Sequence, residues 1–124
     1  MTLFVNLPVR ELDRSKSFFA ALGLEFYGMA EDMASVVINE RTQVMLLAQP
    51  TFARYARHDV SDPGVTTEVI LVLGLENPAQ VDELVDKALA AGATPVGEAS
   101  TEAGRYQRGF ADLDGHQWAA LCLV

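Results

Sequence analysis

The C-terminal end of the chain constrains its fold most, because two apolar runs there flank the dipeptide Asp114-Gly115. Asp-Gly between such runs predicts a tight β-hairpin, since the turn needs a positive φ that glycine adopts without steric cost. The second arm of the hairpin, residues 118–124, is apolar almost throughout. Such a run is typical of a central strand that is buried on both faces.

The rest of the chain contains two stretches with the same predicted order of elements. The first has a strand at 3–9, a helix capped by Asp13 and ended by Gly23, and strands at 24–29, 34–39 and 43–48. The second has a strand at 67–75, a helix between Asn77 and Gly92, and strands at 94–96, 105–112 and 117–123, with a polar loop at 98–104.

This order predicts an α+β domain built from two βαβββ halves, residues 1–49 and 67–124. Residues 50–66 form the linker, in which a short helix over 52–56 is possible. A ferredoxin-like α+β sandwich also packs two helices on an antiparallel sheet, but it needs only four strands. The sequence predicts about eight, which favours the duplicated βαβββ arrangement.

Composition limits the classes of partner. Half of the residues are hydrophobic, which predicts a packed core, and the net charge of -8 argues against nucleic acid and anionic membranes. No apolar run approaches the roughly 20 residues that span a bilayer. The single Cys122 excludes a disulfide within one chain. We therefore expect a cytoplasmic protein without a membrane segment.

Two motifs carry a resemblance to a known family. The motifs are Asn-Leu-Pro-Val-Arg-Glu-Leu at residues 6–12 and Asp-Leu-Asp-Gly-His-Gln-Trp at residues 112–118. The first lies in the first predicted strand and the start of the helix after it, and the second lies in the closing hairpin. With the predicted order of elements, the chain resembles the vicinal oxygen chelate superfamily, which includes glyoxalases, bleomycin-resistance proteins and extradiol dioxygenases. The resemblance covers nearly the whole chain. It implies a funnel-shaped mixed sheet whose paired halves enclose a small-molecule pocket, and it implies a homodimer.

The resemblance also implies where a metal would be bound. Metal-dependent members place four ligands on strands that face the pocket, and these positions fall at Phe4, Leu46, Glu68 and Ala119 of this chain, with a one-residue uncertainty at Leu46. Three of these four side chains cannot bind a hard divalent ion. One carboxylate does not hold such an ion against water. We therefore expect neither a metal nor another cofactor.

Glu68 is the candidate for chemistry. In an apolar pocket it would suit proton abstraction or recognition of a cation, whereas at the start of a strand it would be an ordinary exposed carboxylate. Asn6 shares the face of Phe4. Arg108 and Trp118 would suit a planar or anionic molecule near a cavity mouth, or would be a surface arginine and a core tryptophan.

The sequence thus predicts a metal-free protein, similar to glyoxalases and bleomycin-resistance proteins, that binds a small apolar or aromatic molecule. One alternative is a metal-dependent lyase or dioxygenase with displaced ligands, and another is a non-catalytic interaction module. Whether any reaction is catalysed stays open. The expected ligand-binding residues are Phe4, Asn6, Leu46, Glu68, Ile70, Arg108, Trp118 and Ala119.

Overall fold

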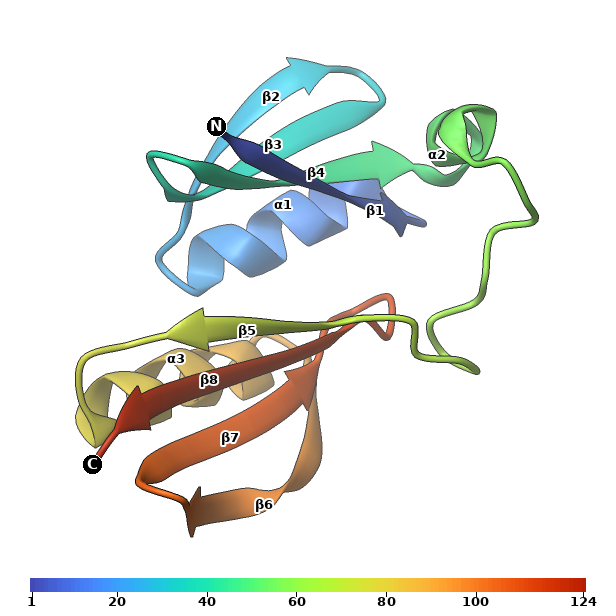
Figure 1. The fold of residues 1–124 in the computed structure, drawn as a ribbon. Helices are drawn as coiled ribbons and strands as arrows, with labels where there is room; N and C mark the ends of the chain where they lie inside the picture. Colours follow the sequence, from blue (N-terminus) through green and yellow to red (C-terminus); the bar gives the residue numbers. More distant parts are fainter. The chain divides into compact units, whose positions relative to one another are not determined.

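The computed structural model describes residues 1–124, which divide into two compact units, Met1–Ser61 and Asp62–Val124. The first unit contains β1 (Leu3–Val9), α1 (Leu12–Ala21), β2 (Glu25–Ala30), β3 (Met33–Asn39), β4 (Thr42–Ala48) and α2 (Gln49–Tyr55). The second contains β5 (Ile70–Gly74), α3 (Pro78–Ala90), β6 (Thr94–Glu102), β7 (Arg105–Ala111) and β8 (Gln117–Leu123). The predicted α+β class and the two βαβββ modules are confirmed (Figure 1).

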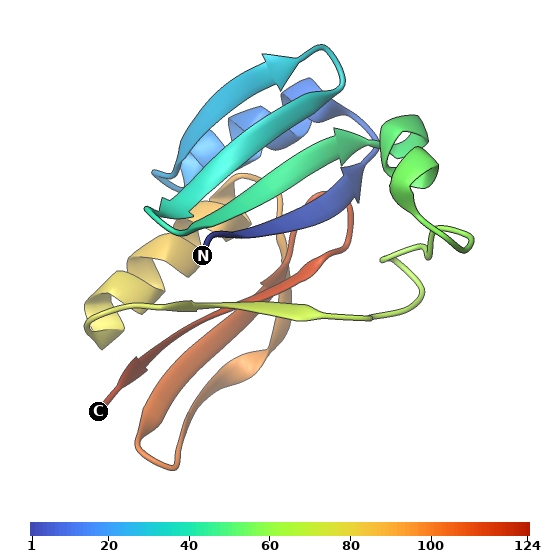
Figure 2. The same ribbon diagram turned by 45° about the horizontal axis from the view of Figure 1, so that its top comes forward.

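Each unit has one four-stranded mixed sheet, in the order β1-β4-β3-β2 or β5-β8-β7-β6. The first strand of each unit lies at a sheet edge and is parallel to the last strand, and the remaining neighbours are antiparallel. Helix α1 covers one face of the first sheet and α3 covers one face of the second (Figures 1 and 2). We call the opposite face of each sheet its open face.

The core of the first unit lies between α1 and its sheet. Phe18 and Phe19 of α1 are buried, and their rings meet edge to face with centroids 5.0 Å apart. Helix α1 begins at Leu12, so the prediction that Asp13 caps it is wrong. Asp13 lies in the first helical turn instead, where its carboxylate is 3.5 Å from the Lys16 ammonium. A carboxylate there also interacts favourably with the helix dipole.

Helix α3 follows its sequence signals closely. The Asn77 side chain accepts a hydrogen bond of 2.9 Å from the backbone N–H of Gln80, and Pro78 is the first residue of the helix. Val81, Val85 and Ala88 are buried against the second sheet. No helix in the structure is long and apolar enough to cross a membrane.

The hairpin between β7 and β8 is held by the buried carboxylate of Asp112. Its Oδ1 accepts hydrogen bonds from the backbone N–H groups of Asp114 and His116, each 3.0 Å long. Its Oδ2 accepts a 3.0 Å bond from the indole Nε1 of Trp118. Burial raises the pKa of Asp112, against the opposing effects of His116 and these N–H donors. Gly115 has a φ of 98°, the conformation for which the turn requires glycine.

Two sequence expectations in the second unit need correction. Strand β8 is central, but it is fully buried on one face only: Trp118, Ala120 and Cys122 face α3, while the alternate residues remain partly exposed. The predicted loop at 98–104 is largely strand, because β6 continues to Glu102 across an irregularity after Val96. An edge strand tolerates such a bulge better than a central strand does.

Candidate functional site

Strand register defines the open face of the first sheet. Phe4 is opposite Gln43, Asn6 is opposite Met45, and Met45 is in turn opposite Ser35. Because neighbouring residues of a strand point to opposite faces, these five side chains share one face. A Cβ added at Gly28 would lie 3.9 Å from the ammonium nitrogen of Lys16 in α1, so Gly28 of β2 faces the helix. The residue before Gly28 therefore points to the open face.

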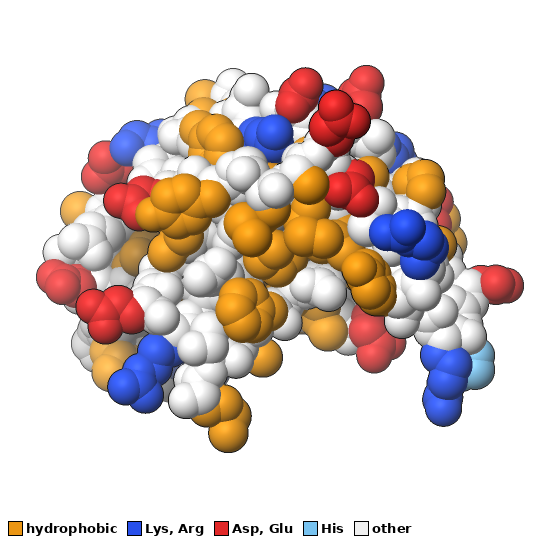
Figure 3. Space-filling view, turned by 90° about the horizontal axis from the view of Figure 1, so that it is seen from above, with side chains coloured by type: hydrophobic (Ala, Val, Ile, Leu, Met, Phe, Trp, Pro, Cys, Tyr) orange, Lys and Arg blue, Asp and Glu red, His pale blue; other side chains and the backbone are white.

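Hydrophobic side chains gather on this open face (Figure 3). Phe4 on β1 is 55% exposed, and Tyr27 on β2, which is opposite Ser35, is 58% exposed. Met29 is also exposed, near the end of β2. Covering aromatic side chains with this much exposed surface, by a ligand or by another protein surface, lowers the free energy. The face therefore offers an apolar platform.

A polar pair interrupts that platform. The buried hydroxyl of Ser35 donates a hydrogen bond to Oε1 of Gln43. The bond fixes the Gln43 amide and leaves its Nε2, with two N–H donors, available for an outside acceptor. Sequence reasoning missed both residues, because the pairing of β1 with β4 that puts Gln43 opposite Phe4 is a long-range feature.

Leu46 is not on this face. It is fully buried, opposite Leu7 in β1 and Ala34 in β3, on the side that α1 covers. The position expected for Leu46 is therefore corrected by one residue, since its two neighbours in β4, Met45 and Leu47, point to the open face. The parallel register of β1 and β4, which the sequence did not specify, decides this point.

The open face of the second sheet carries Ile70, Val72 and Ala119, and Val72 is directly opposite Ala119. Ile70 is 52% exposed. Glu68 precedes β5 by two residues, is exposed, and lies in a bend. The structure thus brings Ile70 and Ala119 together on one face, with Glu68 just before the strand that carries Ile70.

Arg108 and Trp118 lie on the other face of that sheet. Nη1 of Arg108 is 3.1 Å from Asp82 and 3.0 Å from Asp86, both on α3. Trp118 is 1% exposed, and its ring is parallel to that of Phe110 with centroids 6.3 Å apart. Both side chains therefore attach the sheet to α3, which matches the alternative of a surface arginine and a core tryptophan.

No family profile and no curated protein sequence matches the chain. Solved structures do, however. The hypothetical protein SA1046 from S. aureus is 30% identical over 98% of this chain and 93% of its own, with a TM-score of 0.87. A glyoxalase/bleomycin resistance protein/dioxygenase family enzyme from Burkholderia phytofirmans PsJN is 17% identical over 98% and 97%, with a TM-score of 0.81.

A glyoxalase-related enzyme from Fulvimarina pelagi is 16% identical over 98% of this chain and 87% of its own, with a TM-score of 0.84. The TM-scores show that these neighbours share the fold described above. The chain has the vicinal oxygen chelate fold. The resemblance predicted from residues 6–12 and 112–118 is thereby confirmed for the fold.

The metal-binding positions implied for the vicinal oxygen chelate fold do not suit a hard divalent ion in this chain. Phe4 and Ala119 have no ligating atom, and Met45, one of the two open-face candidates on β4, offers only a thioether. No group of three or more His, Cys, Asp or Glu side chains that could hold a metal ion occurs in the structure.

Proposed function

We propose that this protein binds a small, largely apolar or aromatic molecule, without a metal, against the open face of its first sheet. The observation that carries the proposal is the open face of the first sheet, where exposed Phe4 and Tyr27 lie on the same face as the fixed amide of Gln43. Binding sites for small molecules commonly combine an apolar surface with a few fixed polar groups.

The side chains suggest what such a ligand contains. A flat apolar ring would cover Phe4, and a carbonyl or hydroxyl oxygen on it would accept the N–H of Gln43. Asn6, one position further along the same face of β1, can supply a second hydrogen bond. The second unit, taken by itself, carries Ile70, Val72 and Ala119 on its own open face, and Glu68 lies two residues before β5.

Methyl-labelled NMR tests the proposal. The probe is 2-naphthol, a planar aromatic molecule with one hydroxyl, and the signals are the methyl groups of Met29 and Met45. These signals should shift and saturate. Phe4→Ser should weaken binding by about tenfold, since loss of roughly 1.4 kcal/mol of apolar contact has that effect.

Val65→Ser is the matched control, because Val65 is an exposed apolar residue in the loop before β5. It should leave the affinity unchanged. Equal effects of the two substitutions, or methyl signals that do not move, would contradict a site on this open face. The alternative of an interaction module without a small-molecule role would then be preferred.

A further inference from the structure

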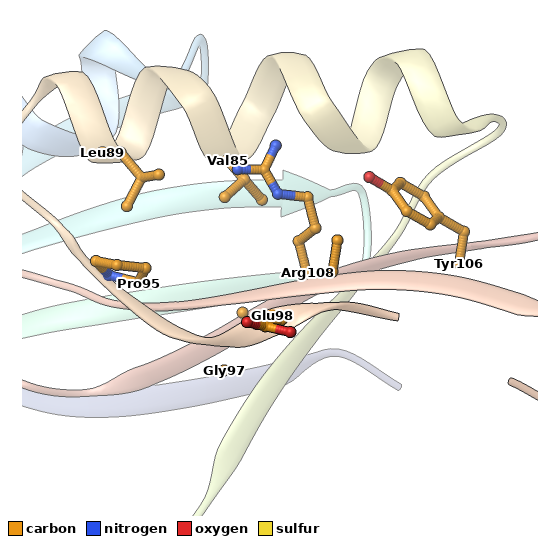
Figure 4. Close-up of a pocket in the computed structure, with 9 residues that line it drawn as sticks. Val85, Leu89, Pro95, Gly97, Glu98, Tyr106 and Arg108 are labelled. Atoms are coloured by element: carbon orange, nitrogen blue, oxygen red, sulfur yellow. The ribbon is translucent and has the colours of Figure 1, made fainter. Parts of the chain in front are cut away.

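The second unit contains a cavity of about 310 Å³ between α3 and the paired strands β6 and β7 (Figure 4). It lies on the helix side of the sheet, so it is separate from the open face discussed above. Val85 and Leu89 extend from α3 towards the strands, and Arg108 and Tyr106 extend from β7 towards α3. Pro95 and Glu98 of β6 also line it.

A bulge in β6 accounts for the space. Between Val96 and Ser100, β6 advances four residues while its partners on β7 change by two, from Gly109 to Gln107. Strand β6 therefore holds two extra residues, which bend it locally. Gly97 has a φ of 67°, and a Cβ at Gly109 would lie 3.0 Å from the Val96 carbonyl oxygen. Both glycines thus allow the bulge to form beside the cavity.

The charge around the cavity is negative. Arg108 uses Nη1 to contact both Asp82 and Asp86, so two carboxylates already neutralise its guanidinium. The Tyr106 hydroxyl donates to Asp82 at 2.6 Å. Glu98 is an exposed carboxylate on the opposite strand. Three carboxylates against one guanidinium leave a local charge of about minus two at neutral pH.

We propose that this cavity binds a small organic cation, with an ammonium group near Glu98 and an apolar body against Val85, Leu89 and Pro95. An anion is disfavoured, because the guanidinium that would attract it is already paired with two carboxylates. A neutral apolar molecule would make the same contacts with the apolar lining but would gain nothing from the charge.

Three probes of similar shape separate these possibilities: 2-phenylethylamine as the cation, 2-phenylethanol as the neutral compound and phenylacetate as the anion. Each is titrated to ~20 mM, which covers the weak affinities of fragment-sized ligands. The readout is the amide NMR shift of Gly97, Glu98 and Gly109. The cation should bind most tightly and the anion least.

Glu98→Gln should weaken binding of 2-phenylethylamine about two- to fivefold, the range expected when an exposed charge pair is lost. Glu102→Gln is the matched control, because Glu102 is also an exposed carboxylate of β6 but lies outside the cavity. It should change the affinity by much less. Phenylacetate binding as tightly as the amine, equal effects of the two substitutions, or unmoved amide signals would each overturn the proposal.

Discussion

Asp112 shows how one side chain can fix the turn that closes the fold. Its two carboxylate oxygens accept three N–H groups, including the indole of Trp118. We predict that Asp112→Asn lowers the free energy of unfolding by about 1 to 3 kcal/mol. An Asn side chain has only one acceptor oxygen, so its NH2 group must face an N–H donor that Asp112 accepts. Urea unfolding measures the change.

The same explanation predicts coupling between Asp112 and Trp118. In a Trp118→Phe background the indole donor is gone, so Asp112→Asn should cost less than it does in the natural protein. Strictly additive losses of unfolding free energy would show that the contact between these two side chains does not contribute to stability.

Glu68 provides a second test at the level of a single residue. If Glu68 takes part in ligand binding, Glu68→Gln should change the affinity for 2-naphthol, or its pH dependence between about pH 5 and 8, with little effect on stability because the side chain is exposed. Glu76→Gln, an exposed carboxylate just after β5, is the control. Unaltered binding across this pH range would make Glu68 an ordinary surface carboxylate.

Alternation placed Asn6 on the face of Phe4, and the strand register puts both residues on the open face. Ile70 and Ala119 were expected together from the family resemblance, and register places them on one face of the second sheet. Alternation excludes Trp118 from the face of its neighbour Ala119. Leu46 needed more than alternation, because only the pairing of β4 with β1 decides which of its residues share a face with Phe4.

At the scale of the element, α3 is attached to β7 through a polar network. The Tyr106 hydroxyl and the Arg108 guanidinium lower the pKa of Asp82 below its ordinary value of 3.8, with the Tyr106 hydrogen bond as the largest cause. A carboxyl group whose pKa is lowered in the folded state stabilises the fold above pH 3.8. That stabilisation is lost as the pH falls through the lowered pKa. Tyr106→Phe should therefore move the pKa of Asp82 up towards 3.8.

An NMR titration of the Asp82 side-chain carboxyl measures this change. The Asp86 carboxyl serves as an internal reference, because it contacts Arg108 without a hydrogen bond from Tyr106. A pKa of Asp82 that is unchanged in the Tyr106→Phe protein would contradict the assigned network.

The elements themselves were largely predictable. Asn77, Pro78 and Gly92 marked α3 because caps and breakers act locally. Strand β6 was predicted too short, since Gly97 and the polar residues after it are typical of a loop. Pairing with β7 extends the strand past the bulge, and pairing is a long-range effect that no local window contains.

At the scale of the whole molecule, the first prediction concerns metal content. Because Phe4 and Ala119 replace ligating side chains at the expected positions, purified protein should hold no stoichiometric Ni, Zn, Fe or Mn after dialysis. Elemental analysis measures this directly. About one equivalent of any of these metals would favour the metal-dependent lyase or dioxygenase alternative, with Glu68 and a histidine as the first residues to substitute.

The last prediction is that two chains associate. Strands β1 and β5 are sheet edges, and exposed edges are ready to pair with other chains unless they are covered. Ile70 and Val72 expose apolar surface on one such edge strand, and twofold symmetry is the commonest way to bury a surface of this kind. Light scattering at micromolar concentration should therefore give twice the chain mass of 13.5 kDa. Ile70→Lys should shift the mass towards one chain, because a charge would enter the buried contact, while Val65→Lys should leave it unchanged. A mass of one chain at every concentration would refute the dimer.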